Sequence, residues 1–306
     1  MNLLHLRYIC EVAKSGSISK AAHKLYINQP RLSKIIKAVE EDIGIKIFER
    51  TSQGVVPTHN GLLFIDQAKK IIHEADHLEN MYKSHQKVVT FDMSVPRASY
   101  ISTAFVNYLD EALVKDHEVK MNYHETNSME TIELVFNGDA ELGIIRLPIE
   151  DQEYYLNLLE LKGLGFKQLF TFHYQLIMSQ DNPLCRTDIY FKDLRNQIEL
   201  LHGDISLPGV PLARTNHLHE RLSNARVINI YERGSQFEIL DKLKDSYMWV
   251  SPMPKQTLER FKLVQKECQD RKMMWTDLLV YRKGYHLTKA NHEFLEKLNE
   301  VICDIS

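Results

Sequence analysis

The chain has 306 residues, of which 44% are hydrophobic and 26% are charged, and its formal net charge is −3. This length allows two or three domains, and the composition is that of a soluble globular protein. No apolar run reaches the ~20 residues that cross a bilayer, and the start, MNLLHLRYICEV, lacks the parts of a signal peptide. We therefore expect a cytoplasmic protein with no membrane partner.

Charge is distributed unevenly along the chain. Residues 1–60 contain nine Lys or Arg and five Asp or Glu, a balance of +4, which leaves −7 for the other 246 residues. A basic head on an acidic body is expected when one end of a protein meets a polyanion.

Four cysteines lie far apart without CxxC spacing, so neither a zinc site nor a disulfide framework is indicated. They are Cys10, Cys185, Cys268 and Cys303. We expect buried, reduced thiols. The alternative, a redox switch, requires a lowered thiol pKa and access to solvent.

Three helices are predicted within residues 1–44. Apolar residues at three- and four-residue spacing mark the first, and Gly16 ends it. Ser17 can cap the second, whose paired alanines allow a close helix crossing, and Asn28 can cap the third, with Pro30 in its first turn. The buried stripe of the third helix comprises Leu32, Ile35, Ile36, Val39 and Ile43, and Gly44 ends the helix.

The opposite side of the third helix presents Arg31, Ser33, Lys34 and Lys37, with Asn28 and Gln29 at the same end. A short-linked helix pair with such a surface fits a helix-turn-helix whose cations neutralise phosphates and whose polar groups read bases. The alternative is an ordinary solvated helix face. Two β-prone runs, 45–48 and 55–56, flank ERTSQG and predict a hairpin wing that places Arg50 and Gln53 against DNA.

The stretch from Ser17 to Gly61 resembles the N-terminal pattern of LysR-type transcriptional regulators. The matching residues are Ala21, Ala22, Leu25, Gln29, Pro30, Leu32, Ser33, Ile36, Glu40, Gly44, Phe48, Arg50, Thr58 and Gly61. Lys34 stands where the family usually has Arg, and lacks the planar guanidinium fork. Our predicted DNA-binding residues are Ser17, Asn28, Gln29, Pro30, Arg31, Ser33, Lys34, Lys37, Arg50 and Gln53.

Residues 62–83 read as one long helix without Pro or Gly. Its seam comprises Phe64, Ala68, Ile71, Ala75, Leu78 and Tyr82, widened by Ile65 and Ile72. A second copy of the same helix is the simplest cover for this seam, and the resemblance implies the same dimer, with half-sites about one duplex turn apart. Packing against the chain's own body is the alternative.

Alternating strands and helices after residue 87 predict α/β units around a parallel sheet. The resemblance implies an α+β multidomain protein. Residues 1–60 form a winged helix-turn-helix, 61–87 a dimerising linker helix, and 88–306 a two-lobe, periplasmic-binding-protein-like effector domain. Lobe I comprises 90–164 and 268–306, and lobe II comprises 165–267.

Polar residues at strand ends are the candidates for effector binding, and an anion would suit a helix N-terminus beside Arg97 or Arg146. Taken singly, such residues are more often caps, turns or surface groups, and only the Thr126–Ser128 loop is evenly balanced between the two interpretations. The candidates are Arg97, Ser99, Tyr100, Thr126, Asn127, Ser128, Arg146, His202, Asp204 and Ser251.

An enzyme is not indicated. HExxH, GxSxG, Walker A and GxGxxG motifs are all absent, and HLHE at 217–220 is only a weak metal suggestion. We predict no cofactor and no metal. A two-lobe small-molecule binding protein without a role in transcription is the alternative. Such a protein would have to be exported, and it would have no use for the basic N-terminal domain. The resemblance implies an effector-tuned regulator that binds double-stranded DNA as a dimer or tetramer and contacts RNA polymerase.

Overall fold

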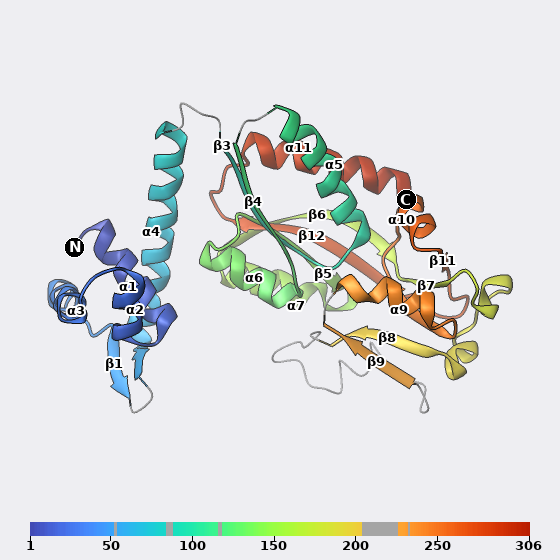
Figure 1. Ribbon diagram of the computed structural model, residues 1–306, viewed down its shortest axis with the longest axis horizontal. Coiled ribbons are helices and arrows are strands. Elements are labelled where there is room, and N and C mark those ends of the chain that lie inside the picture. The colour runs from blue at the N-terminus through green and yellow to red at the C-terminus, as the bar shows by residue number, and fades with distance from the viewer. Residues whose placement is uncertain (52–53, 84–87, 116–117, 204–225, 232) are drawn as a thin grey trace. The chain divides into compact units, whose positions relative to one another are not determined.

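The computed structural model describes residues 1–51, 54–83, 88–115, 118–203, 226–231 and 233–306 (Figure 1). The chain divides into two compact units, Met1–Gln86 and Lys87–Ser306. Within the described ranges, no helix combines the length and the apolarity needed to cross a bilayer.

The first unit begins with three short helices, α1 (Leu3–Ser15), α2 (Ile18–Lys24) and α3 (Gln29–Ile43). The predicted caps are confirmed: the Ser17 hydroxyl accepts from the Lys20 N–H, and the Asn28 carboxamide oxygen accepts from the Arg31 N–H. Gly44 ends α3 in the left-handed region, at φ 72°, where a residue without Cβ is least strained.

A short hairpin follows, formed by β1 (Phe48–Thr51) and β2 (Gly54–Pro57) in antiparallel register. The prediction placed the first strand at 45–48 and put Arg50 in the turn; instead Arg50 lies in β1 opposite Val55. The reason is that the Ile47 and Phe48 N–H groups both donate to the Glu40 carboxylate, so pairing starts later. Gln53 lies outside the described residues.

Helix α4 (His59–Lys83) completes this unit. Ile65 and Ala68 are buried, and Phe64 packs against the same core as α1 and α3. Ile71 and Leu78 remain 51% and 56% exposed. The predicted seam is therefore divided: its first turns complete the core of the head, and only its later apolar residues are available to another surface. The Tyr82 side chain lies outside the described part.

The second unit contains two five-stranded sheets. The first has the order β4-β3-β5-β12-β6 and is formed by β3 (Val88–Val95), β4 (Glu118–Glu125), β5 (Leu142–Pro148), β6 (Leu164–His173) and β12 (Met274–Arg282). Helices α5 (Ser99–Lys115) and α11 (Lys289–Ile305) cover one face, and α6 (Ser128–Asn137) and α7 (Gln152–Leu161) cover the other (Figure 1).

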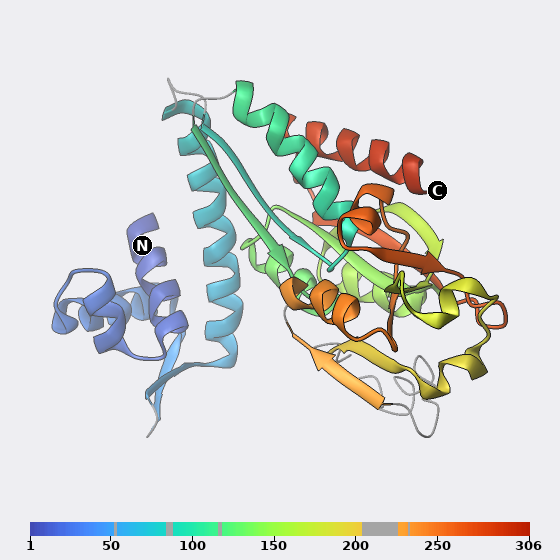
Figure 2. The ribbon, with the colours of Figure 1, turned by 45° about the vertical axis from the view of Figure 1, so that its right-hand side comes forward.

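The second sheet has the order β11-β7-β10-β8-β9. Its strands are β7 (Gln175–Ser179), β8 (Ile198–His202), β9 (Arg226–Ile230), β10 (Ser246–Val250) and β11 (Leu263–Lys266). Helices α9 (Gln236–Lys242) and α10 (Lys255–Arg260) follow β9 and β10, as Figure 2 shows from a second side. Short 3-10 turns lie at Ile149–Asp151, Pro183–Arg186, Phe191–Asn196 and Arg233–Ser235.

Two expectations about this unit were wrong. Both sheets are mixed rather than parallel, because β12 runs antiparallel to β5 and β6, and β7 runs antiparallel to β10 and β11. Each of these two strands is the first after the chain passes from one sheet to the other, so no crossover helix sets its direction. Residues 165–173, which were assigned to lobe II, belong to β6 of the first sheet.

Candidate functional site

The exposed side of α3 presents the predicted DNA-binding residues together. Asn28, Gln29, Arg31 and Lys34 are exposed, Pro30 lies with them at the helix start, and Ser33 is half-buried. Lys37 is exposed, and its ammonium lies 3.6 Å from the Glu41 carboxylate. A surface ion pair at this distance is weak, so the Lys37 charge is still available to another partner. Among described residues, Arg31, Lys34 and Arg50 form no ion pair. The cations of this face are therefore available to a polyanion.

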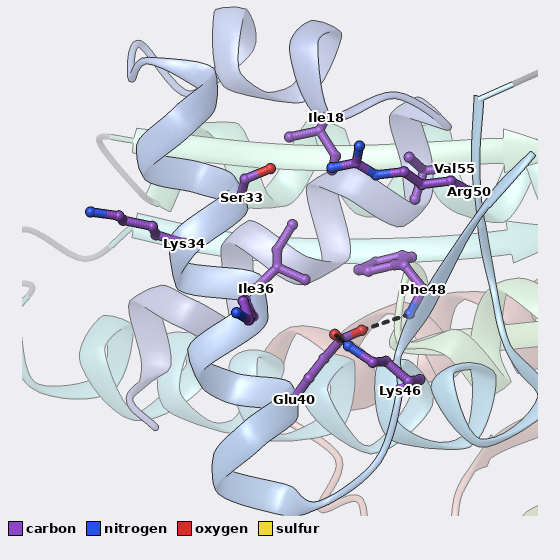
Figure 3. A pocket seen from close by; sticks show the side chains of 10 residues that line it. Ile18, Ser33, Lys34, Ile36, Glu40, Lys46, Phe48, Arg50 and Val55 are labelled. Carbon is purple, nitrogen blue, oxygen red and sulfur yellow. Dashed lines mark hydrogen bonds and ion pairs between the residues drawn. The ribbon is translucent and has the colours of Figure 1, made fainter.

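A pocket of about 340 Å³ separates α3 from the hairpin. Its floor is apolar and its rim is cationic, with lining from Ile18, Ser33, Lys34, Ile36, Lys37, Glu40, Lys46, Phe48, Arg50 and Val55. Figure 3 shows the Ser33 hydroxyl and the Arg50 guanidinium entering from opposite sides. Four cations against one carboxylate give this concavity the charge that attracts phosphate groups.

Glu40 fixes the hairpin to α3. Its side chain is 7% exposed, accepts from the Ile47 and Phe48 N–H groups at 2.8 and 3.1 Å, and pairs with the Lys46 ammonium at 2.8 Å. Although burial raises the pKa of this carboxyl, the Lys46 ammonium and the two N–H groups outweigh it and lower the pKa. Lys46 was not among the predicted DNA-binding residues, although it lies in the run 45–48 that was predicted as the first strand of the wing.

Two further residues of the family pattern close the base of the hairpin. The Thr58 hydroxyl donates to the Lys46 carbonyl at 2.6 Å and accepts from the Gly61 N–H at 2.9 Å. A Cβ on Gly61 would lie 2.0 Å from the Ile47 carbonyl oxygen, so only glycine lets α4 approach this closely. Ser17 caps α2 beside Gly16, whose carbonyl accepts from the Val55 N–H at 3.0 Å.

In the second unit, Arg146 is already neutralised. Its guanidinium forms a two-point bond with Asp277 at 2.8 and 2.7 Å, and the two side chains are 8% and 0% exposed. Tyr100 is fully buried and its hydroxyl donates to Asp277. Burial, followed by the Asp277 carboxylate, raises the pKa of Tyr100. A buried Arg with its own carboxylate is satisfied without an anionic ligand.

The loop from Thr126 to Ser128 is likewise occupied within its own lobe. Thr126 is 4% exposed and its hydroxyl donates to Glu130, while Asn127 caps α6 by accepting from the Glu130 N–H at 2.9 Å. The Ser128 hydroxyl donates to the Arg146 carbonyl at 2.6 Å and accepts from the Arg146 N–H at 3.0 Å. Each of the three side chains therefore has a structural role within its own lobe.

Of the other predicted cleft residues, Arg97 precedes α5 and is half-buried, and Ser99 is the 6% exposed first residue of α5. His202 ends β8 and is half-buried, and Ser251 follows β10 and is 2% exposed. Asp204 and the HLHE cluster at 217–220 lie outside the described residues. Within the described ranges, no three His, Cys, Asp or Glu side chains gather to hold a metal.

Arg233, which sequence reasoning missed, reaches from the second sheet's side to Ser99. Its guanidinium donates to the Ser99 hydroxyl at 3.0 Å, to the Ser102 hydroxyl at 2.9 Å and to the Glu125 carboxylate. Its place just before α9 was the only local feature in the sequence, and nothing in its surroundings indicated a partner more than a hundred residues away.

Comparison with known proteins identifies the helix-turn-helix segment of the first unit. Residues 3–62 match the model of the bacterial regulatory helix-turn-helix protein, lysR family. The first unit of this chain therefore contains a LysR-type helix-turn-helix domain. A Bacillus subtilis relative, the uncharacterized HTH-type transcriptional regulator YcgK, is 28% identical over 153 residues, which cover 50% of this chain and 47% of YcgK. The aligned part thus spans about half the length of that relative.

Two solved structures share the fold of this chain along almost its whole length. Full-length CbnR complexed with its target DNA has a TM-score of 0.58 and 14% identity, covering 98% of this chain and 100% of CbnR. Full-length LysG from Corynebacterium glutamicum, with arginine bound as effector, has a TM-score of 0.60 and 13% identity, covering 99% and 98%. At these identities the likeness shows the fold.

Proposed function

We propose that this chain is a LysR-type DNA-binding transcriptional regulator that acts in the cytoplasm. The observation that carries the proposal is the cationic face of α3, where Arg31 and Lys34 are exposed and form no ion pair with another described residue. Beside it lies the cationic pocket between α3 and the hairpin. CbnR, which shares this fold, is a protein solved on its target DNA.

The polar side chains at the start of α3 divide into two roles. Gln29 and Ser33 carry hydrogen-bonding groups that distinguish bases in a major groove, whereas Arg31, Lys37 and Arg50 neutralise phosphates. In this assignment α3 enters the groove and β1 follows the backbone beside it. Glu40 keeps these two surfaces at a fixed separation, because it binds the hairpin backbone from α3.

Two copies of the chain bind together in this proposal. Ile71 and Leu78 on α4 are large apolar side chains with more than half their surface exposed, and pairing of α4 with its copy removes that surface from water. A two-fold dimer presents two α3 helices, which match half-sites about one duplex turn, ~34 Å, apart. Assembly of dimers into tetramers and contact with RNA polymerase belong to the same proposal.

A small molecule bound between the two lobes tunes this activity. The two sheets with their helices form lobes that meet at the start of α5, where Ser99 contacts Arg233, and LysG, which shares the fold, was solved with arginine bound as effector. A ligand that binds one lobe arrangement more tightly shifts the population toward it. Because Arg146 is paired with Asp277, an anionic effector that bound its guanidinium would have to compete with that carboxylate.

Enrichment of DNA from a random duplex library tests the proposal. Purified full-length protein should select a two-fold symmetric sequence whose half-sites lie about one turn apart. Gln29→Ala and Ser33→Ala should relax the selected sequence while the protein still binds DNA. Failure of the unsubstituted protein to enrich any sequence, at low salt as well as high, contradicts the proposal.

A further inference from the structure

The Arg233 side chain connects the two lobes of the second unit. It lies in the 3-10 turn Arg233–Ser235, which leads directly into α9 beside the second sheet. Its three partners belong to the first lobe: Ser99 and Ser102 form the first turn of α5, and Glu125 ends β4. These partners are 108 to 134 residues away in sequence.

The surroundings make this contact stronger than an ordinary surface ion pair. The Arg233 and Glu125 side chains are 18% and 21% exposed, and Ser99 is 6% exposed. Charge-assisted hydrogen bonds that are largely removed from water are stronger than neutral ones, and exposed pairs contribute little. The guanidinium also lies 6.0 Å from the Phe237 ring centroid, which holds it against its own lobe.

The contact also depends on Glu125. Arg233 lies at the N-terminal end of α5, a 17-residue helix, where the positive end of the helix dipole disfavours a cation. The Glu125 carboxylate offsets the positive charge of both the Arg233 guanidinium and the N-terminal end of α5. If that carboxylate is removed or is drawn to another partner, the electrostatics at this point change from attraction to repulsion.

We propose that Arg233 and Glu125 form a latch that holds the two lobes together at the start of α5. Its loss allows the lobes to separate, so the latch sets the lobe equilibrium on which an effector acts. Only this regulatory use rests on the proposed function. The latch itself is a property of the second unit and is measurable without DNA.

The test is the distance between two spin labels in the full-length protein, measured by pulsed electron paramagnetic resonance. Cysteines replace Val106 on α5, which is 61% exposed, and Glu238 on α9, which is exposed; Cys303→Ser removes the exposed native thiol. Excess unlabelled protein suppresses distances between subunits. The parent should give one narrow distribution, and Arg233→Glu should add a population at longer separation, lowering the ratio of closed to open molecules about tenfold or more.

Charge exchange separates a latch from general damage. Arg233→Glu combined with Glu125→Arg restores opposite charges, so the double variant should return most molecules to the narrow distribution. Arg226→Ala is the matched control, because Arg226 contacts Asn196 and Asp245 within its own lobe, and it should leave the distribution unchanged. An unchanged distribution in Arg233→Glu, or a double variant more open than both single variants, overturns the latch.

Discussion

At the residue scale, Glu40 supports the surface that we propose binds DNA without being part of its exposed face. The sequence matched Glu40 to the family, but its role emerges only from the contacts with Ile47, Phe48 and Lys46. Thr58 and Gly61 similarly fix the hairpin to α4. These matching residues thus build the interface, and the exposed residues between them supply its chemistry.

Glu40→Ala should destabilise the first unit by about 1–3 kcal/mol, because two backbone N–H groups lose their acceptor. Glu41→Ala, an exposed neighbour, should cost less than about 0.5 kcal/mol. The folded state lowers the Glu40 pKa below its ordinary value of 4.5. The stabilisation is therefore complete above that value and is lost as the pH falls through the lowered pKa.

Urea unfolding of both variants at pH 7 and at pH 3.5, followed for the first unit, measures these differences. The gap between Glu40→Ala and the parent should narrow at the lower pH. A gap that is the same at both values, or that widens in acid, contradicts the assigned role of the Glu40 carboxylate.

Burial controls the reactivity of the cysteines. Burial, followed by the hydrogen bond to Asp270, raises the pKa of Cys268 to about 11, and burial also raises the pKa of Cys10 and Cys185. Cys303 is exposed. Because the thiolate is the reactive form, iodoacetamide at pH 8 should modify Cys303 at least about tenfold faster than Cys268 in the folded protein. Peptide mass spectrometry measures both rates, and equal rates contradict this ranking.

At the element scale, residues with strong local preferences were predictable and those set by distant contacts were not. Ser17, Asn28, Asn127 and Gly44 mark helix ends through bonds within a few residues, so the sequence was sufficient. The register of β1 depends on Glu40, eight residues before it, and was predicted too early. β7 and β12, the first strands after each passage between the sheets, were expected to be parallel to their neighbours but are antiparallel. The local hydrophobic pattern identifies a strand but does not give its direction.

The exposed part of α4 gives a prediction at the same scale. Ile71→Asp places a carboxylate on the surface that we assign to the dimer, whereas Ile65, 6% exposed, belongs to the head's own core. The variant should sediment as a monomer in analytical ultracentrifugation and keep its helical circular dichroism. Lys70→Ala, beside it and paired with Asp66 at 2.8 Å, serves as the control. Ile71→Asp sedimenting as the parent's assembly contradicts pairing through this surface.

At the scale of the whole molecule, charge is distributed unevenly along the chain. The balance of +4 in residues 1–60 against −7 in the rest agrees with our proposal that the first unit binds a polyanion. The expected cleft residues were found at strand ends and helix starts, but the structure engages most of them inside one lobe. The contact that crosses between lobes, Arg233 with Glu125, connects positions that local pattern cannot pair.

The central claim is that the cationic face of α3 binds duplex DNA, and the salt dependence of binding tests it most directly. Fluorescence anisotropy compares the enriched duplex with a scrambled one over a range of salt concentrations, using the full-length protein and its Arg31→Ala and Lys70→Ala variants. Arg31→Ala should weaken binding to both duplexes and reduce the slope of log affinity against log salt by about one for each substituted α3. Lys70→Ala should retain the parent's slope. An Arg31→Ala slope equal to the parent's, or a parent protein that binds neither duplex, contradicts the account.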